Sequence, residues 1–324
     1  MVQKVKVEDA VGKSLAHDVV AYGPGLKRVS FKRGHVITSG DLNRLKDTGD
    51  FFVLIREGNE KKVHEEEAAT RMARASIDSS AKRSIPTQGK VNLLAVVPGL
   101  LKVKADVAKR VNLIDDFIIA TKSNNVWVKK GSLIGSVKIV PISVAETRMK
   151  KVERLLKSKG PVLKIVPIKI RKIGLVITGT EVYKGRIKDA FYPTLTEKLA
   201  EYGLKIGKSV IVPDDVDRIT REVLAIKREG YQLILLAGGM AVDAGDVTPT
   251  AMKETGAKII SRGVPMFPGS MAMVAYLDGT PVLGLPACLI PDKVTSFDTV
   301  LPRVLAGEKL TRDEIAGLGH GGLL

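Results

Sequence analysis

The sequence predicts an α/β protein: a mainly parallel three-layer α/β domain preceded by a β-rich α+β N-terminal region. After residue 171, short apolar runs alternate with amphipathic segments, the pattern of a parallel sheet with helices on both faces. Before it, short strand-like runs are separated by turn residues. The predicted divisions are 1–165, with subdomains at about 1–75 and 76–165, then 166–310, and a flexible tail at 311–324.

Composition limits the class of protein. The chain has 324 residues, of which 44% are hydrophobic, and no apolar run is long enough to span a membrane. The N-terminal residues contain no apolar signal core. Cys288 is the single cysteine, which excludes an internal disulfide and fits a reducing compartment. We therefore predict a cytoplasmic protein with no membrane association.

The net charge of +17 is concentrated in the first half of the chain. Residues 1–171 hold 34 Lys and Arg against 17 Asp and Glu, whereas residues 172–324 hold 18 of each. Such a surface attracts polyanions. Aromatic residues make up only 4% of the chain, so stacking platforms for bases are scarce and nucleic acid is not the expected partner. A solvated basic face is the favoured interpretation.

The first half reads as strands with three helices among them. His64-Glu65-Glu66-Glu67 lacks the spacing of a zinc-binding helix and is interpreted as an acidic helix start. Trp127, the only tryptophan, is expected in the core. The predicted strands cover 51–55, 91–97, 117–121, 126–130 and 133–140, and the predicted helices cover 64–75, 106–114 and 144–159. Residues 163–171 are expected to form a strand or a connector.

The second half alternates between strand and helix. Its apolar runs are short and continuous, as in strands buried on both faces. Its helical segments place their apolar residues on one side. The predicted strands cover 173–177, 208–212, 233–236, 272–276 and 281–284. The predicted helices cover 193–202, 218–229 and 291–305, with one more beginning at Thr248.

A strand, a glycine turn, carboxylates and a helix start follow one another in LILLAGGMAVDAGDVTPTAM, residues 233–252. Gly238 and Gly239 allow backbone N–H groups to approach an anion. Asp246 is better placed than Asp243 to bind a cation beside that anion. Thr248 is expected as the N-cap of the helix, followed by proline. This order predicts an anion or nucleotide site at the carboxyl edge of the sheet, or else an ordinary βα turn.

Two other loops are expected at the same edge, after residues 177 and 212. They bring Glu181, Asp214 and Asp215 toward Asp246 and toward backbone amides. Carboxylates beside amides suit a site in which Mg²⁺ links them to phosphate. The pattern therefore predicts a magnesium-assisted phosphate site.

Four segments resemble the molybdopterin-binding domain family, which includes molybdopterin adenylyltransferase, molybdopterin molybdenumtransferase and the corresponding parts of gephyrin. They are TGTEVYKGRIKDAF (178–191), VPDDVDRI (212–219), AGGMAVDAGDVTPTA (237–251) and PVLGLPA (281–287). The large N-terminal half resembles the molybdenumtransferase branch.

The resemblance implies roles for particular residues. Glu181, Asp214 and Asp246 match the acidic residues that act on metal and oxyanion, and Asp214 and Asp246 would hold Mg²⁺. The residues implied to contact the ligand are Thr178, Gly179, Thr180, Asp189, Asp215, Gly238, Gly239, Met240, Asp243, Thr248 and Pro286. The implied partners are molybdopterin or its adenylylated form, molybdate, a second copy in a homo-oligomer, and a molybdoenzyme or cofactor-pathway protein.

Two departures from the family pattern affect the functional prediction. Gly284-Leu285-Pro286 continues as Ala287-Cys288-Leu289 in place of Gly-Asn-Pro, and Asp189 is followed by Ala190-Phe191 in place of Ser-Asn or Thr-Asn. Binding is therefore predicted more firmly than catalysis. The hypotheses are a cofactor biosynthesis protein that inserts molybdenum, a non-catalytic carrier or sensor, and, more weakly, a nucleic-acid-binding regulator. Cys288 is interpreted as a small apolar residue rather than a thiolate.

Overall fold

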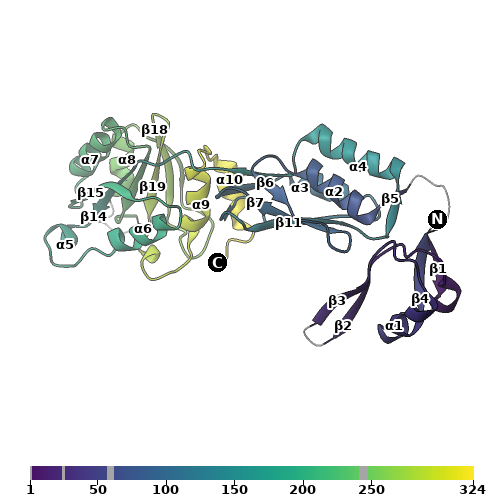
Figure 1. Cartoon of the computed structure of the whole chain (residues 1–324). Coiled ribbons are helices and arrows are strands. Elements are labelled where there is room, and N and C mark those ends of the chain that lie inside the picture. The colour runs from purple at the N-terminus through teal and green to yellow at the C-terminus, as the bar shows by residue number, and fades with distance from the viewer. Residues whose placement is uncertain (1, 24–25, 57–61, 241–246) are drawn as a thin grey trace. The chain divides into compact units, whose positions relative to one another are not determined.

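The computed structural model describes residues 2–23, 26–56, 62–240 and 247–324 (Figure 1). The chain divides into two compact units, Met1–Val166 and Pro167–Leu324. The α/β class and the β-rich N-terminal region predicted from the sequence are confirmed. Within the described ranges, every helix is too short or too polar to serve as a membrane span.

The first part of unit 1 is a small β structure with one short helix. Strand β1 (Val2–Lys6) pairs antiparallel with β4 (Phe52–Arg56), and β2 (Val19–Gly23) forms a hairpin with β3 (Leu26–Phe31). Helix α1 (Leu42–Asp47) follows a 3₁₀ turn, η2 (Ser39–Asp41). A second 3₁₀ turn, η1 (Val7–Ala10), follows β1. Their shared core is Val7, Ala10, Leu15, Val19, Phe31, Ile37, Leu45, Val53 and Ile55.

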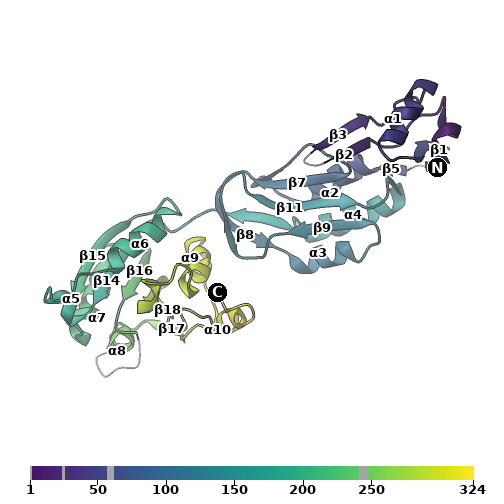
Figure 2. The same cartoon turned by 90° about the horizontal axis from the view of Figure 1, so that it is seen from below.

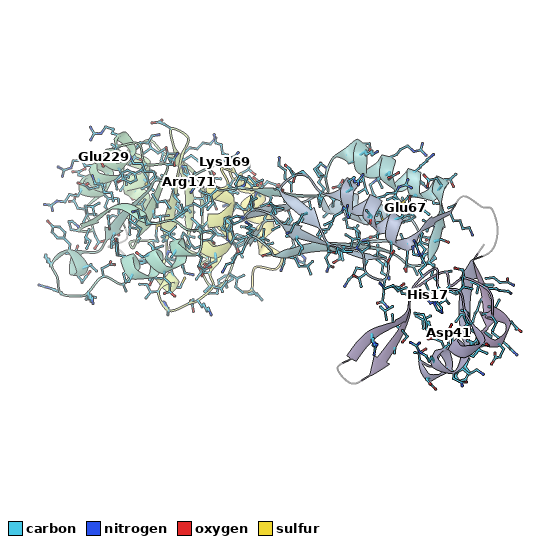
Figure 3. All side chains as sticks on the ribbon, in the orientation of Figure 1. His17, Asp41, Glu67, Lys169, Arg171 and Glu229 are labelled. Carbon is cyan, nitrogen blue, oxygen red and sulfur yellow. The ribbon has the colours of Figure 1, made fainter. Side chains whose placement is uncertain are left out.

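Asp41, which Figure 3 labels, fixes the turn before α1. Its carboxylate accepts hydrogen bonds from the Thr38 N–H at 2.9 Å and from the His35 ring at 2.8 Å. The bond with His35, followed by that with the Thr38 backbone, lowers the pKa of Asp41 to about 2. The turn is therefore held by an ionised carboxylate, as in a capping box.

The second part of unit 1 packs helices on a four-stranded sheet ordered β6-β7-β11-β9. These strands are Ala81–Arg83, Lys90–Ala95, Leu133–Ile139 and Phe117–Thr121. A second sheet is ordered β10-β8-β13, from Val126–Val128, Gly99–Val103 and Leu163–Val166, and β5 (Lys62–His64) pairs with β12 (Ser143–Ala145). The helices are α2 (Glu65–Ser76), α3 (Ala105–Asn112) and α4 (Glu146–Lys159). Alternate residues of β7 (Val91, Leu93 and Ala95) are buried, as expected for a sheet with one covered face.

One outer edge of this sheet is closed by a side chain. β9 lies at the end of the strand order. Asn112, the last residue of α3, donates from Nδ2 to the Ile119 carbonyl at 3.0 Å and accepts from the Ile119 N–H at 2.8 Å. The asparagine amide thus replaces the hydrogen bonds that a neighbouring strand would form there.

Unit 2 contains a six-stranded sheet ordered β15-β14-β16-β19-β18-β17. β15 (Ile206–Val212), β14 (Ile173–Thr178), β16 (Leu233–Ala237) and β19 (Thr280–Leu285) are parallel to one another. β18 (Met273–Leu277) and β17 (Lys258–Arg262) complete the sheet in antiparallel pairing. Every residue of β14 and β16 is buried, which explains their continuous apolar sequences.

Helices cover both faces of this sheet, which gives the predicted three layers (Figure 2). α6 (Phe191–Ala200) and α9 (Ser296–Leu305) share one core with alternate residues of the central strands. α7 (Val216–Arg228) and α8 (Thr248–Glu254) share the other core. The burial of Leu195 and Leu199 on one face and of Ile219 and Val223 on the other follows the period of a helix.

The C-terminal residues differ from the predicted flexible tail. They form α10 (Arg312–Ala316) and a 3₁₀ turn, η4 (Gly317–Gly319). Thr311 and Glu314 form a capping box, and Ile315 is fully buried in the α6–α9 core. Arg303, 4% exposed on α9, contacts Glu308 at 2.7 Å and Glu314. An apolar anchor and an ion pair therefore attach this segment to unit 2.

Several element boundaries also differ from those predicted. β8 and β17 are additional to the predicted strands, and the loop after β14 contains one helical turn, α5 (Thr180–Tyr183). α9 begins at Ser296 rather than near residue 291, because Thr295 and Asp298 form its capping box. A 3₁₀ turn, η3 (Ala287–Leu289), occupies part of the intervening segment.

Candidate ligand site at the carboxyl edge of the sheet

The four parallel strands of unit 2 end side by side. Thr178 pairs with Val212, Ile177 with Ala237, and Ala237 with Leu285. The loops that follow these strands therefore leave from one edge, as the sequence predicts. Parallel α/β sheets bind ligands at this edge because loops from several strands meet there.

Asp214 joins the first two loops. Its Oδ2 accepts hydrogen bonds from the Thr180 N–H at 2.8 Å and the Thr180 hydroxyl at 3.1 Å, and the Asp214 N–H donates back to that hydroxyl at 3.2 Å. The Gly179 N–H donates to the Val212 carbonyl at 3.2 Å. The amides of Gly179 and Thr180 are thus used within the protein, which limits the predicted role of this loop as an amide cradle. Asp214 Oδ1 forms no hydrogen bond or ion pair within the described ranges.

Gly238 and Gly239 form a tight turn that only glycine fits. Their φ angles are +96° and +59°. A Cβ on Gly238 would lie 2.5 Å from the Thr178 carbonyl oxygen, and one on Gly239 would lie 2.5 Å from Thr248 Oγ1. The Gly238 N–H donates weakly to the Leu285 carbonyl at 3.4 Å, whereas the Gly239 N–H makes no hydrogen bond to described residues.

Thr248 is not the helix cap that the sequence predicts. It is the first residue of α8, and Val247 occupies the cap position without a side-chain bond. The Thr248 hydroxyl instead donates to the Gly238 carbonyl at 3.1 Å and lies 3.4 Å from Thr178 Oγ1. Both threonines are buried, so their hydroxyls form the floor beneath the glycine turn.

Two of the predicted ligand carboxylates serve the ends of helices. Asp189 accepts from the N–H groups of Phe191 at 2.8 Å and Tyr192 at 3.0 Å, at the start of α6. Asp215 is the N-cap of α7 and accepts from the Arg218 N–H at 2.8 Å. These bonds explain both aspartates without a ligand.

The remaining predicted residues differ in accessibility. Met240 is 2% exposed and its side chain packs against Gly284, so it offers almost no surface to a ligand. Pro286 is buried at the end of β19, and Glu181 is exposed on α5. Asp243 and Asp246 lie outside the described residues. Within the described ranges no three His, Cys, Asp or Glu side chains form a group that could hold a metal ion.

Arg218 is absent from the predicted site residues, although it lies in the quoted segment 212–219. It is exposed in the first turn of α7, close to Asp214 and Asp215 in the sequence. Its guanidinium donates to the Tyr183 hydroxyl at 3.1 Å and lies 5.7 Å from that ring. The contact links α5 to α7, and the Arg218 guanidinium places a positive charge beside the loops at the carboxyl edge of the sheet.

The Cys288 thiol lies in the 3₁₀ turn after β19. Burial, followed by the charge of Asp292, raises its pKa. The thiol is therefore neutral at physiological pH, which agrees with the predicted structural role and disfavours a thiolate ligand.

The fold and these loops define a three-layer α/β domain with a polar site at the carboxyl edge of its sheet. Residues 174–306 of this unit match the family described as the probable molybdopterin binding domain, which confirms the resemblance noted in the sequence. The domain is therefore of the type found in molybdenum cofactor biosynthesis. Residues 4–57 match a domain of unknown function.

Similar proteins carry related names. A molybdopterin molybdenumtransferase of Staphylococcus aureus is 25% identical over 51% of this chain and 37% of its own length. A CinA-like protein of Mycolicibacterium vanbaalenii is 34% identical over 24% of this chain and 18% of its own length. The chain thus spans less than two fifths of either relative.

Solved structures with a similar domain include the molybdopterin biosynthesis enzyme MoaB of Thermus thermophilus. It has 23% identity and a TM-score of 0.36, over 43% of this chain and 98% of that one. A molybdenum cofactor biosynthesis protein of Pyrococcus furiosus has 15% identity and a TM-score of 0.28, over 96% of this chain and 66% of that one.

Proposed function

We propose that unit 2 binds molybdopterin or its adenylylated form at the carboxyl edge of its sheet. The observation that carries the proposal is the turn at Gly238 and Gly239, which lies over the hydroxyls of Thr178 and Thr248. The Gly239 amide forms no hydrogen bond to the described residues and would donate to an anionic oxygen of the ligand, and Arg218 adds positive charge at the rim. Together they suit the terminal phosphate of the ligand.

The carboxylates at this edge of the sheet, Asp214 and Asp246, would serve to hold Mg²⁺. Without a metal, Asp214 would repel a phosphate. A magnesium ion held by Asp214 would supply positive charge that offsets this repulsion, since magnesium prefers carboxylate, phosphate and water oxygens. Asp246 is proposed as the second carboxylate from its position in the sequence. In this arrangement the proposed overall reaction is that adenylylated molybdopterin and molybdate would give the molybdenum-loaded pterin, with AMP and water released.

Calorimetric titration of the purified full-length chain with molybdopterin, and with its adenylylated form, tests binding. We expect saturable binding of at least one form, and Mg²⁺ should strengthen binding of the adenylylated form. The absence of heat with both ligands, supported by mass spectrometry showing no retained pterin, would contradict the proposal.

A non-catalytic carrier or sensor is the second candidate. Two observations favour it: Asp189 is committed to the start of α6, and the exposed Glu181 side chain forms no hydrogen bond or ion pair with the described residues. Incubation of adenylylated molybdopterin with molybdate, Mg²⁺ and the protein separates the two. Formation of active cofactor identifies an insertion enzyme, whereas tight binding without conversion identifies a carrier.

Replacing Asp214 with asparagine should weaken binding in a metal-dependent way. Asparagine can still accept the hydrogen bonds from Thr180, so the loop is retained while the negative charge is removed. We expect the gain in affinity that Mg²⁺ gives the wild-type protein to fall about tenfold, the equivalent of about 1.4 kcal/mol. Metal-free binding should stay the same or tighten slightly, as measured by calorimetry.

Asp217→Asn is the matched control, because Asp217 is an exposed carboxylate in the first turn of the same α7. It should leave the magnesium effect unchanged. An equal loss in both variants would mean that general surface charge, rather than a metal bridged by Asp214, produces the effect.

A further inference from the structure

A groove runs across unit 1 where the ends of α2 and α4 meet β6. It consists of two adjoining hollows of about 380 Å³ and 570 Å³. Arg74, Ile77 and Asp78 line both of them. We call this feature the basic groove. Its size is that of sites that hold several side chains of a ligand.

The floor of the basic groove is apolar. Ile77 lines both hollows and Pro161 lines the α4 end; both are partly exposed, whereas Leu156 beneath them is fully buried. Ile85 lines the other hollow and is 84% exposed. A partner that covers this large aliphatic side chain removes apolar surface from water, which favours binding.

The rim of the basic groove is positively charged. Arg74, Lys82, Arg83 and Lys157 are all exposed and form no ion pair with a carboxylate of the described residues. Residues 62–166 as a whole hold 21 Lys and Arg against 9 Asp and Glu. The rim thus presents cations that form no ion pair within the described ranges, although Lys157 lies near enough to Glu153 to lower the pKa of that carboxylate.

The two acidic residues of the groove are already engaged. Asp78 accepts hydrogen bonds from the Ser80 N–H and hydroxyl. Glu153 accepts from Arg71 at 2.7 Å and 3.0 Å, and Arg71 also binds both oxygens of Glu146. The bond with Arg71 lowers the pKa of Glu153, so this carboxylate stays ionised and paired. Asp78 keeps its negative charge, but the cations that line the groove outnumber its two carboxylates, so its net charge is positive.

We propose that the basic groove binds an acidic peptide segment of a partner protein in which carboxylate side chains alternate with aliphatic ones. Aliphatic side chains would cover Ile85 and the floor, while carboxylates would pair with Arg74, Arg83 and Lys157. A nucleic acid would satisfy the rim but would leave the apolar floor unused. This inference is independent of the ligand site in unit 2, and its test uses no pterin.

Fluorescence polarisation with the full-length chain tests the proposal. The probe is a labelled synthetic peptide in which aspartate alternates with leucine. The comparison probes replace all its aspartates with asparagine or all its leucines with serine, and a labelled DNA duplex is the fourth probe. We expect the aspartate–leucine peptide to bind most tightly.

The variant Arg74→Glu with Arg83→Glu should weaken binding of this peptide at least about tenfold, because two attractive contacts become repulsive. Lys109→Glu with Arg110→Glu on α3 makes the same change of charge outside the groove and should change affinity less than about twofold. Ile85→Asp should weaken binding of the aspartate–leucine peptide more than binding of the peptide in which serine replaces every leucine.

Three results would overturn the proposal. An equal loss of peptide affinity in the Arg74/Arg83 and the Lys109/Arg110 double variants would indicate nonspecific charge attraction. Equal affinity for the leucine and serine peptides would show that the floor is not used. Tighter binding of the duplex, lost on substitution of Arg74 and Arg83, would assign the groove to nucleic acid. Circular dichroism and thermal unfolding of each variant identify any loss of fold, and a failed pair is then replaced by Arg74→Gln with Arg83→Gln.

Discussion

Replacement of Gly239 by alanine is expected to reduce pterin affinity more than about tenfold, a cost of more than about 1.4 kcal/mol. The new methyl group would lie 2.5 Å from Thr248 Oγ1 and 3.1 Å from Thr178 Oγ1, at a φ of +59° that alanine disfavours. The turn must shift, and the Gly239 amide shifts with it. Calorimetry with molybdopterin measures the change in affinity.

Gly279→Ala separates a local effect on the site from general backbone strain. Gly279 also has a positive φ, +82°, but a Cβ there would meet nothing within 4 Å. We expect both variants to lose about 1–2 kcal/mol in thermal unfolding from the positive φ angle. Gly239→Ala should lose more than this because of its clash with Thr248, and only Gly239→Ala should lose pterin affinity. Unchanged affinity in a folded Gly239→Ala protein would place the ligand elsewhere.

Arg303→Met is expected to destabilise unit 2 by roughly 2–3 kcal/mol, below the cost of breaking a fully buried ion pair because both carboxylates are partly exposed. The Arg303 side chain is 5% exposed, against 23% for Glu308 and 41% for Glu314. Its removal leaves these carboxylates without their cation and loosens α10. Urea unfolding at neutral pH, followed in full-length protein, measures the change in free energy.

Acid should reduce the difference between Arg303→Met and the wild-type protein. Bonds from Thr311 and Arg303 lower the pKa of Glu314 below its ordinary value of 4.5. This contribution to stability is therefore present above pH 4.5 and is lost as the pH falls through the lowered pKa of the folded state. Arg221→Met, an exposed arginine on α7, is the control and should have little effect at either pH. A difference that grows in acid would contradict this explanation.

The sequence is most informative where burial and secondary structure coincide. Strands 173–177 and 233–236 can be predicted almost to the residue because strands buried on both faces need continuous apolar runs. The alternation of strands with helices then implies parallel pairing and loops at one edge. β8 is not predicted, because its first residue is a glycine that follows a proline and this pair resembles a turn. β17 is not predicted either, because it is an edge strand with a largely polar sequence.

The candidate site is only partly predictable, because one residue type can serve two purposes. An aspartate before a helix suits a helix cap as well as a ligand, and only the hydrogen bonds of Asp189 and Asp215 show the first role. Thr248 precedes a proline, as a helix N-cap residue often does, but in the fold its hydroxyl donates a hydrogen bond to the Gly238 carbonyl. The convergence of the loops follows from strand order, whereas the use of each amide depends on contacts between distant residues.

The amide of Asn112 has a consequence for how copies of this protein behave at high concentration. An unpaired edge strand is a template on which further chains can add, strand upon strand, into fibres. At Ile119 both backbone groups of β9 are already bonded to that asparagine. Addition of a strand from another copy across Ile119 would first require breaking both bonds, so the Asn112 amide opposes extension of the sheet at this position.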